Sequence, residues 1–191
     1  MNRYDPDEHK YYINEKEVPS VTGVIPKPDG FNFVKPDIME KAREDGNENH
    51  SMLKLYSDTG ETYKDPMLMA VDNWIKKTSK KIGNPICWEI PLFSEKHKYG
   101  GTPDIVFEHG IVDLKRSFVS ARYHALQCAG LDYLAYEEGI IKKRTKQWWI
   151  LEWNGEKLIP HAVYNIMAEP VFIGLVKDWH IMLAYNNYIG A

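Results

Sequence analysis

Short runs of apolar residues separated by turn residues predict most of the β-strands in this chain. Two such runs lie close together, Ile105-Val106-Phe107 and Ile111-Val112, and the second continues to Leu114. His109-Gly110 stands between them, and glycine favours tight turns because it reaches positive φ at no steric cost. Residues 100–117 therefore predict a β-hairpin, and we expect the rest of the chain to be organised around it.

Three further segments have the pattern of strands: residues 11–25, 87–93 and 147–163. The first and the last predict hairpins, because the polar turns Asn14–Lys16 and Asn154-Gly155 divide them. The middle segment predicts a single core strand, in which Glu89 stands among apolar neighbours. In the last segment Trp148 and Trp149 are consecutive, so they must point to opposite faces of the sheet.

Four segments repeat apolar residues every three or four positions, as α-helices do. They are residues 37–50, 65–81, 120–138 and 168–187. Asp65-Pro66 supplies an N-cap and a first helical position, whereas Pro28 and Gly30 break regular structure. We therefore expect an α/β fold with a central mixed sheet flanked by helices, divided into an N-terminal hairpin and loop (1–35) and a core (36–191).

The composition narrows the class of protein. The 191 residues are enough for one domain with a substantial core, and the net charge of −3 excludes a uniformly basic nucleic-acid binder. Two cysteines, Cys87 and Cys128, are too few for a disulfide scaffold, which fits a reduced cytoplasmic setting. No apolar run reaches the roughly 18 residues of a membrane span, and no signal-peptide pattern opens the chain. We expect neither a membrane span nor secretion.

Three charged residues interrupt the apolar central hairpin. Asp104 opens its first strand, and Asp113 and Lys115 stand two positions apart on the second, so the latter two side chains share a face. Burying such groups costs several kcal/mol per ion unless a partner compensates. A Mg²⁺ or Mn²⁺ ion bound by the carboxylates would be such a partner. The alternative is a surface salt bridge, because Asp-x-Lys occurs by chance in many proteins.

Three other polar residues are candidates for the same site, each with an ordinary structural alternative. His50 follows Gly46 by one helical turn, where the glycine gives the backbone room to approach another element, and His50 itself is either a metal ligand or an ordinary helix residue. Glu89 is either a further metal or water ligand or an edge-strand charge that discourages aggregation. Gln127 lies among the packing residues of its predicted helix, where it either touches the site or faces solvent.

The sequence contains two basic clusters. One is Lys76–Lys81, and the other consists of Arg116, Arg122 and the loop Lys142–Lys146. Either could follow a phosphate backbone, and the first would also stabilise the negative end of a helix dipole. Local patches of this kind are how a slightly acidic chain can bind a polyanion.

Five features follow one another along the chain in a defined order. They are Gly46-x-x-x-His50, Glu89 in a strand, Gly101-x-x-Asp104, Asp113-Leu-Lys115 and Gln127 on the following helix. In this order they resemble the successive motifs of the RecB-like branch of the PD-(D/E)XK nuclease superfamily. The segment Val18-Pro-Ser-Val-Thr22 also resembles the start of phage and prophage nucleases of this branch, which are related to the mitochondrial genome maintenance exonucleases.

The resemblance implies that residues 1–191 form a single nuclease domain with a restriction-endonuclease-like core of helix, three antiparallel strands, helix and a further strand. It also implies a role for each site residue. The metal ligands would be His50, Asp104, Asp113 and the main-chain carbonyl of Leu114. Glu89 would add a ligand or a water contact, and Lys115 would orient the attacking water and stabilise charge in the transition state.

Gln127 would be the first residue of the family's Gln-x-x-x-Tyr motif, but here the chain departs from the pattern. The position four residues later is Leu131, and the nearest tyrosines are Tyr133 and Tyr136. The iron–sulfur nucleases of the superfamily use four cysteines, so two cysteines argue against a cluster.

The resemblance and the hairpin chemistry together predict a Mg²⁺- or Mn²⁺-dependent DNA exonuclease, encoded by a phage or prophage and acting in recombination or DNA processing. We expect DNA as its partner, together with a phage single-strand annealing or recombination protein, in the cytoplasm of a bacterial host. Two alternatives remain open at this point, an endonuclease of the same superfamily and a nucleic-acid-binding module that keeps the fold without cleavage.

Overall fold

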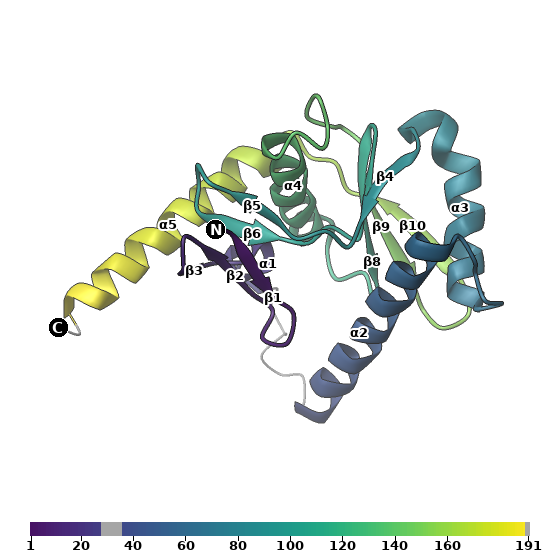
Figure 1. The fold of residues 1–191 in the computed structure, drawn as a ribbon, viewed down its shortest axis with the longest axis horizontal. Coiled ribbons are helices and arrows are strands. Elements are labelled where there is room, and N and C mark those ends of the chain that lie inside the picture. Colours follow the sequence, from purple (N-terminus) through teal and green to yellow (C-terminus); the bar gives the residue numbers. More distant parts are fainter. Residues whose placement is uncertain (28–35, 190–191) are drawn as a thin grey trace.

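The structure is a computed structural model that describes residues 1–27 and 36–189 (Figure 1). The predicted break at Pro28 and Gly30 lies outside the described residues, as do the side chains of residues 36–45 and of Asn47. Within the described chain, no helix combines the length and the apolar composition needed to cross a membrane.

Three sheets and five helices make up the described chain. The elements are β1 (Arg3–Asp5), β2 (Lys10–Ile13), β3 (Lys16–Val18), α1 (Val21–Val24), α2 (Pro36–Thr59), α3 (Pro66–Ile82), β4 (Pro85–Trp88), β5 (Leu92–Ser94), β6 (Tyr99–Gly101), β7 (Ile105–Phe107), β8 (Gly110–Lys115), α4 (Ala121–Glu137), β9 (Trp148–Trp153), β10 (Leu158–Ala162) and α5 (Ala168–Ile189). The main sheet has the order β10-β9-β8-β7-β4, in which only β8 and β9 are parallel. The predicted mixed α/β fold is therefore confirmed.

Helices cover both faces of this sheet (Figure 1). Side chains alternate along β7 and β8, so Val106 and Ile111 join the apolar cluster under α4 and α5, whereas Ile105 and Val112 join the cluster under α2 and α3. Trp148 and Trp149 divide between the same two clusters, as their consecutive positions predict. The core strands are apolar on both faces because each face packs against helices.

The central hairpin is present, but its turn differs from the prediction. Phe107 pairs with Gly110, so the two turn residues are Glu108 and His109 rather than His109 and Gly110. Gly110 is needed for space, because a Cβ atom there would lie 2.8 Å from the main-chain oxygen of Gln147. That oxygen accepts a hydrogen bond from the N–H of Ile111, which joins β8 to the start of β9.

The prediction of one strand over residues 87–93 is wrong. The chain leaves β4 at Glu89, which has a positive φ of 48°, and then enters β5, which pairs with β6 in a separate two-stranded sheet. The N–H of Glu89 donates to the main-chain oxygen of Asp104 at 3.1 Å, which holds this corner against the residue directly before β7. A strand pattern cannot reveal such a corner, because apolar residues continue on both sides of it.

The N-terminal hairpin is confirmed as β2 and β3, with Asn14 and Glu15 both at positive φ in its turn. The end of the predicted strand segment is instead the short helix α1, Val21–Val24. The hairpin gains a third strand, β1, whose three residues are too short for a pattern. The other two predicted hairpin strands, β9 and β10, and the helices α3, α4 and α5 lie within a few residues of their predicted bounds. Helix α2 runs nine residues past His50, to Thr59.

Two helical glycines offer a matched test of this packing. Gly130 of α4 faces Phe172 of α5, and a Cβ on Gly130 would lie 2.6 Å from the Phe172 ring, whereas a Cβ on Gly174 of α5 meets nothing within 4 Å. We expect Gly130→Ala to destabilise the protein by about 1–3 kcal/mol through overpacking. Gly174→Ala should stabilise it by about 0.5–1 kcal/mol, because alanine loses less backbone entropy in a helix. Urea unfolding of both variants measures the change in the free energy of unfolding. Changes of the same sign and size in the two variants would contradict this packing.

Candidate functional site

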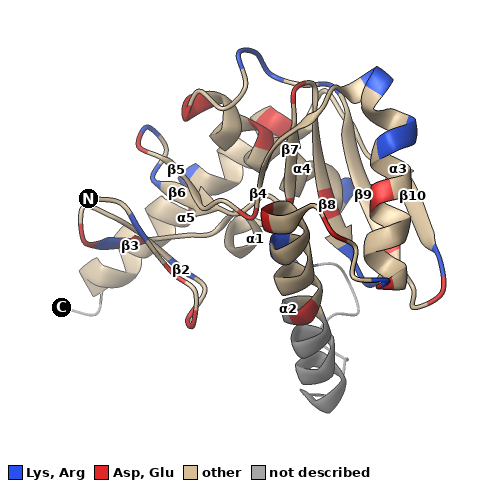
Figure 2. Ribbon diagram, turned by 45° about the vertical axis from the view of Figure 1, so that its right-hand side comes forward, with Lys and Arg blue, Asp and Glu red and all other residues tan. Residues whose placement is uncertain are grey.

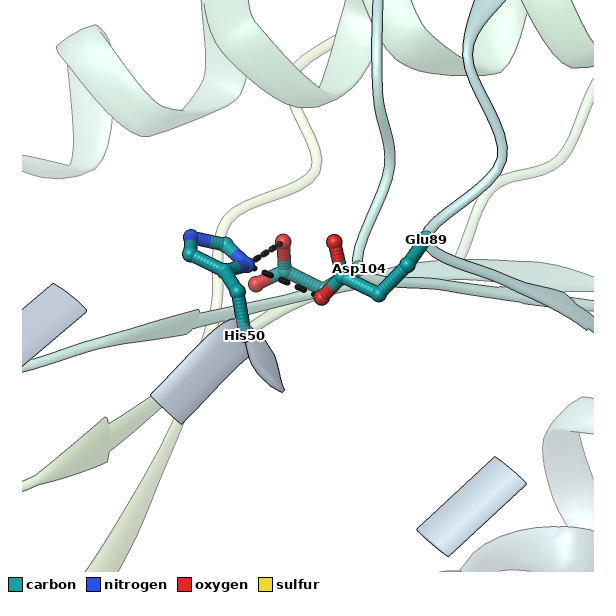
Figure 3. A group of neighbouring side chains, drawn as sticks. All are labelled: His50, Glu89 and Asp104. Carbon is teal, nitrogen blue, oxygen red and sulfur yellow. Dashed lines mark hydrogen bonds and ion pairs between the residues drawn. The ribbon is translucent and has the colours of Figure 1, made fainter. Parts of the chain in front are cut away.

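Three potential metal ligands meet beside the central hairpin (Figure 3). His50 comes from α2, Glu89 from the corner after β4, and Asp104 from the residue before β7. His50 Nδ1 lies 2.9 Å from Glu89 Oε1 and 3.3 Å from Asp104 Oδ1. The potential ligand atoms of the three side chains lie within 4.8 Å of one another, so one cation could contact all three.

Asp104 is the buried member of this group, with 1 % of its surface exposed. Its Oδ2 accepts a hydrogen bond from the N–H of Leu114, which ties the start of β7 to β8. Burial, and then the nearby Asp113 carboxylate, raise the pKa of Asp104. A carboxylate held ionised in this position therefore needs a positive partner.

Asp113 is equally buried, but it has a different set of neighbours. Its Oδ2 lies 2.6 Å from Lys115 Nζ, and its Oδ1 accepts a hydrogen bond from Gln127 Nε2 at 3.1 Å. Burial disfavours the charge on Lys115, yet Asp113 and Asp104 outweigh that effect and raise its pKa. The predicted pairing of Asp113 with Lys115 on one face is therefore present.

The predicted site residues thus fall into two adjoining groups. His50, Glu89 and Asp104 form a set of ligand atoms, while Asp113 is engaged by Lys115 and Gln127. The two groups adjoin, since His50 of the first group and Lys115 and Gln127 of the second line one cavity. Leu114 contributes its N–H to Asp104. Figure 2 colours the acidic positions red, among them one on the ribbon of β8.

The donor set fits a divalent cation. Two carboxylates and one imidazole nitrogen suit Mn²⁺, and the carboxylates suit Mg²⁺. In the protein without metal, the Asp104 carboxylate raises the pKa of His50 to about 9, with burial opposing and Glu89 adding to the shift. The protonated imidazole therefore supplies the positive charge that a bound ion would supply instead.

A cavity of about 290 Å³ lies beside these groups. Its lining includes Thr22, Gly46, Asn49, His50, Leu114, Lys115, Arg116, Ser117, Val119, Tyr123, His124 and Gln127. Gly46 does not bring two backbones together as its spacing suggested, because a Cβ there meets nothing within 4 Å. It borders the cavity, where a larger side chain would reduce the open space.

The expected tyrosines after Gln127 do not reach this cavity. Tyr133 contacts His97 Nε2 at 3.1 Å, and Tyr136 is an exposed residue. Leu131, at the motif position itself, is buried in the core. Tyr123 lines the cavity instead, one helical turn before Gln127. The four-residue spacing between Tyr123 and Gln127 puts both side chains on one face of α4.

The two basic clusters partly converge at the opposite end of β8. Lys81 from the end of α3 and residues 143–146 line a cavity of about 500 Å³ near the β7–β8 turn. Arg144 there is a structural residue, because it binds Asp132 at 2.5 Å and Glu169 at 2.7 Å. Lys76 pairs with Asp72 at 2.6 Å.

No protein-family model matches the chain, and no curated protein matches it. Among solved structures, the crystal structure of SSO0001 is similar over 70 % of this chain and 70 % of its own length, with 14 % sequence identity and a TM-score of 0.39. A likeness of this degree supports no conclusion about function.

Removing the charge of Asp104 tests the metal site. Asp104→Asn keeps an oxygen that can accept from the Leu114 N–H, but it loses the anionic ligand. We expect Mn²⁺ affinity to fall by at least about 10-fold while the fold is retained. Isothermal titration calorimetry measures this, with Glu156→Gln in the exposed β9–β10 turn as the control. Equal Mn²⁺ affinity in the parent and in Asp104→Asn would remove Asp104 from the site.

The shifted pKa of His50 predicts how stability depends on pH when metal is absent. The pKa rises from an ordinary 6.5 to about 9 on folding, so protonation of His50 stabilises the fold fully below pH 6.5 and progressively less as the pH rises through 9. In chelator, the melting temperature of the parent should therefore fall over this range relative to that of His50→Gln. A constant difference between the two proteins would contradict the ion pairing of His50.

Proposed function

We propose that this protein is a Mg²⁺- or Mn²⁺-dependent nuclease that hydrolyses phosphodiester bonds in DNA. The observation that carries the proposal is that the His50–Glu89–Asp104 ligand set and the Asp113–Lys115 ion pair each contribute one residue, His50 and Lys115, to the lining of one cavity. The order of the motifs along the chain, which resembles the RecB-like branch of PD-(D/E)XK nucleases, supports the same reading.

The chemistry of phosphodiester hydrolysis explains why these residue types suit one another. A bound divalent ion supplies Lewis acidity and makes a water nucleophilic at neutral pH. His50, Glu89 and Asp104 would hold that ion. Lys115 keeps its charge in the buried pair with Asp113 and stands at the cavity, where an ammonium stabilises the negative charge that develops on the phosphate. Gln127 holds the other oxygen of Asp113.

Within this class we propose an exonuclease that acts in phage or prophage recombination or DNA processing, in the cytoplasm of a bacterial host. DNA is the substrate, and a phage single-strand annealing or recombination protein is the proposed partner. The support is the resemblance of Val18–Thr22 and of the motif order to such nucleases. An endonuclease of the same superfamily has the same site and is the second candidate.

Digestion of end-labelled linear, circular and single-stranded DNA with Mg²⁺, Mn²⁺ and chelator tests this proposal. An exonuclease releases label from linear DNA and leaves the closed circle intact, whereas an endonuclease opens the circle. Binding without metal-dependent cleavage of any substrate would favour the non-cleaving module.

Substitution of Lys115 distinguishes a role in cleavage from a role in DNA binding. If its ammonium stabilises the transition state, Lys115→Ala should bind DNA nearly as well as the parent but cleave about 10²–10³-fold more slowly, because one electrostatic contact in the transition state is worth that much. A lysine that only bound phosphate would lose affinity, most clearly at raised salt, and keep its rate at saturation.

Single-turnover cleavage at saturating DNA measures this difference. Lys98→Ala, which removes an exposed lysine paired with Glu95, is the matched control and should keep the parent rate. A Lys115→Ala rate within a few-fold of the parent would rule out the catalytic role.

A further inference from the structure

The orientation of one buried amide decides how Asp113 is held. Gln127 is only 5 % exposed, and its Nε2 rather than its Oε1 faces the Asp113 carboxylate. An amide turned by half a rotation would present an oxygen to that carboxylate and repel it. Gln127 Oε1, at the other end of the amide, is buried and makes no hydrogen bond with a described residue. Something must favour the orientation with Nε2 toward Asp113.

His124 lies one helical turn before Gln127 and is 1 % exposed. The N–H of Val119 donates to His124 Nε2 at 3.2 Å, so Nε2 carries a lone pair and the proton of the neutral ring lies on Nδ1. The ring stacks on Phe118, with centroids 5.1 Å apart, which fixes its plane. His124 Nδ1 is also buried and makes no hydrogen bond with a described residue.

The two unsatisfied atoms complement each other. One is an N–H donor on His124, the other an acceptor on Gln127, and the Gln127 side chain acts on the ring as a hydrogen-bonding neighbour. A hydrogen bond between these two atoms would satisfy both, and burial makes this favourable because an unpaired buried polar atom costs about 1–3 kcal/mol.

We propose that His124 is a positioning residue: its Nδ1–H holds Gln127 Oε1, so that Gln127 Nε2 is directed at Asp113 and Asp113 stays aligned with Lys115. This inference rests on the proposed nuclease function for its effect on rate, but not for the arrangement itself. The proposed bond would join two sets of observed contacts: Val119 with His124 on one side, and Gln127, Asp113 and Lys115 on the other.

Two substitutions of His124 separate positioning from simple packing. His124→Phe keeps a ring that can stack on Phe118 but has no donor, whereas His124→Asn loses the ring and keeps an N–H near the position of Nδ1. We expect His124→Phe to slow single-turnover cleavage by about 10–100-fold, which is the usual effect of losing a residue that orients the groups of a metal site. His124→Asn should recover most of that loss. A purely structural histidine predicts the reverse order, because the phenylalanine packs better than the asparagine.

The side-chain amide of Gln127 gives a readout that needs no activity. In the parent its ¹⁵N-labelled amide protons should exchange slowly with solvent, and in His124→Phe they should exchange faster at unchanged melting temperature. Slow exchange in both proteins overturns the positioning role. Faster exchange in a protein that cleaves no DNA would keep the positioning role and reject the proposed function.

An independent observation concerns the end of α5. All residues from Ile181 to Ile189 are exposed, and this part of the helix projects from the rest of the protein (Figure 1). Six of them are large apolar residues that are 41–81 % exposed: Ile181, Met182, Leu183, Tyr185, Tyr188 and Ile189. No charged residue occurs between Trp179 and the last residue of the chain.

The apolar area is larger than a monomer usually leaves in water. A large apolar side chain presents on the order of 200 Å² when free, so six at these exposures amount to roughly 700 Å², whereas the largest patch on a typical monomer is about 300–600 Å². Ile181, Tyr185 and Tyr188 follow the i, i+4, i+7 spacing of a helix–helix contact. The area approaches one side of a standard protein interface, about 800 Å² per partner.

We infer that this end of α5 packs antiparallel against α5 of a second copy of the chain. A two-fold contact places the same segment against itself, and the absence of Asp, Glu, Lys and Arg between Trp179 and Ile189 removes the like-charge repulsion that such a contact would otherwise meet. Antiparallel packing also opposes the two helix dipoles favourably.

Light scattering after size-exclusion chromatography at tens of micromolar protein tests the contact. We expect a dimer that Ile181→Glu combined with Tyr188→Glu converts to a monomer with an unchanged melting temperature of the core. Met69→Glu, an exposed apolar residue on α3, is the matched control and should remain dimeric. A monomeric parent, or a dimer that survives the double substitution, overturns the inference.

Discussion

Two carboxylates on the central hairpin, Asp104 and Asp113, are each only 1 % exposed, and the residues around them supply hydrogen bonds and positive charge to both. Charge buried without a partner costs several kcal/mol per ion. Asp104 accepts a hydrogen bond from the N–H of Leu114 and pairs with His50. Asp113 pairs with Lys115 and accepts a hydrogen bond from Gln127. The central hairpin, α2 and α4 are held together by polar contacts at this point as well as by apolar packing.

The corner at Glu89 belongs to the same arrangement. A continuous strand would have carried the chain past the hairpin. Instead, the positive φ of Glu89 turns the chain and brings the Glu89 carboxylate beside His50. Positive φ in a residue other than glycine costs about 1–3 kcal/mol and persists only where the surroundings enforce it. Here the N–H of Glu89 donates to the carbonyl of Asp104, the residue whose carboxylate shares His50 with Glu89. One backbone contact therefore orders both acidic residues.

Local pattern predicted some residues of the candidate site and missed others. Asp113 and Lys115 share a face because strand period alone requires it. Tyr123 and His124 were missed, since on a helix buried along most of its length the side that borders a cavity has no distinct periodic signal. Tyr133 and Tyr136, the tyrosines nearest to the motif position after Gln127, do not line the cavity, because sequence distance on α4 does not say which turn of the helix borders it.

The sequence by itself determined the elements whose cause is local: the central hairpin, the capped helix after Asp65, the Asn154-Gly155 turn and the alternation of Trp148 and Trp149. Tertiary structure decided everything that depends on approach between distant segments. It placed Gly110 against the Gln147 carbonyl rather than in a turn, and it separated the ligand set of His50, Glu89 and Asp104 from the Asp113–Lys115 pair. Such distances depend on how helices pack across a sheet, which short-range periodicity does not encode.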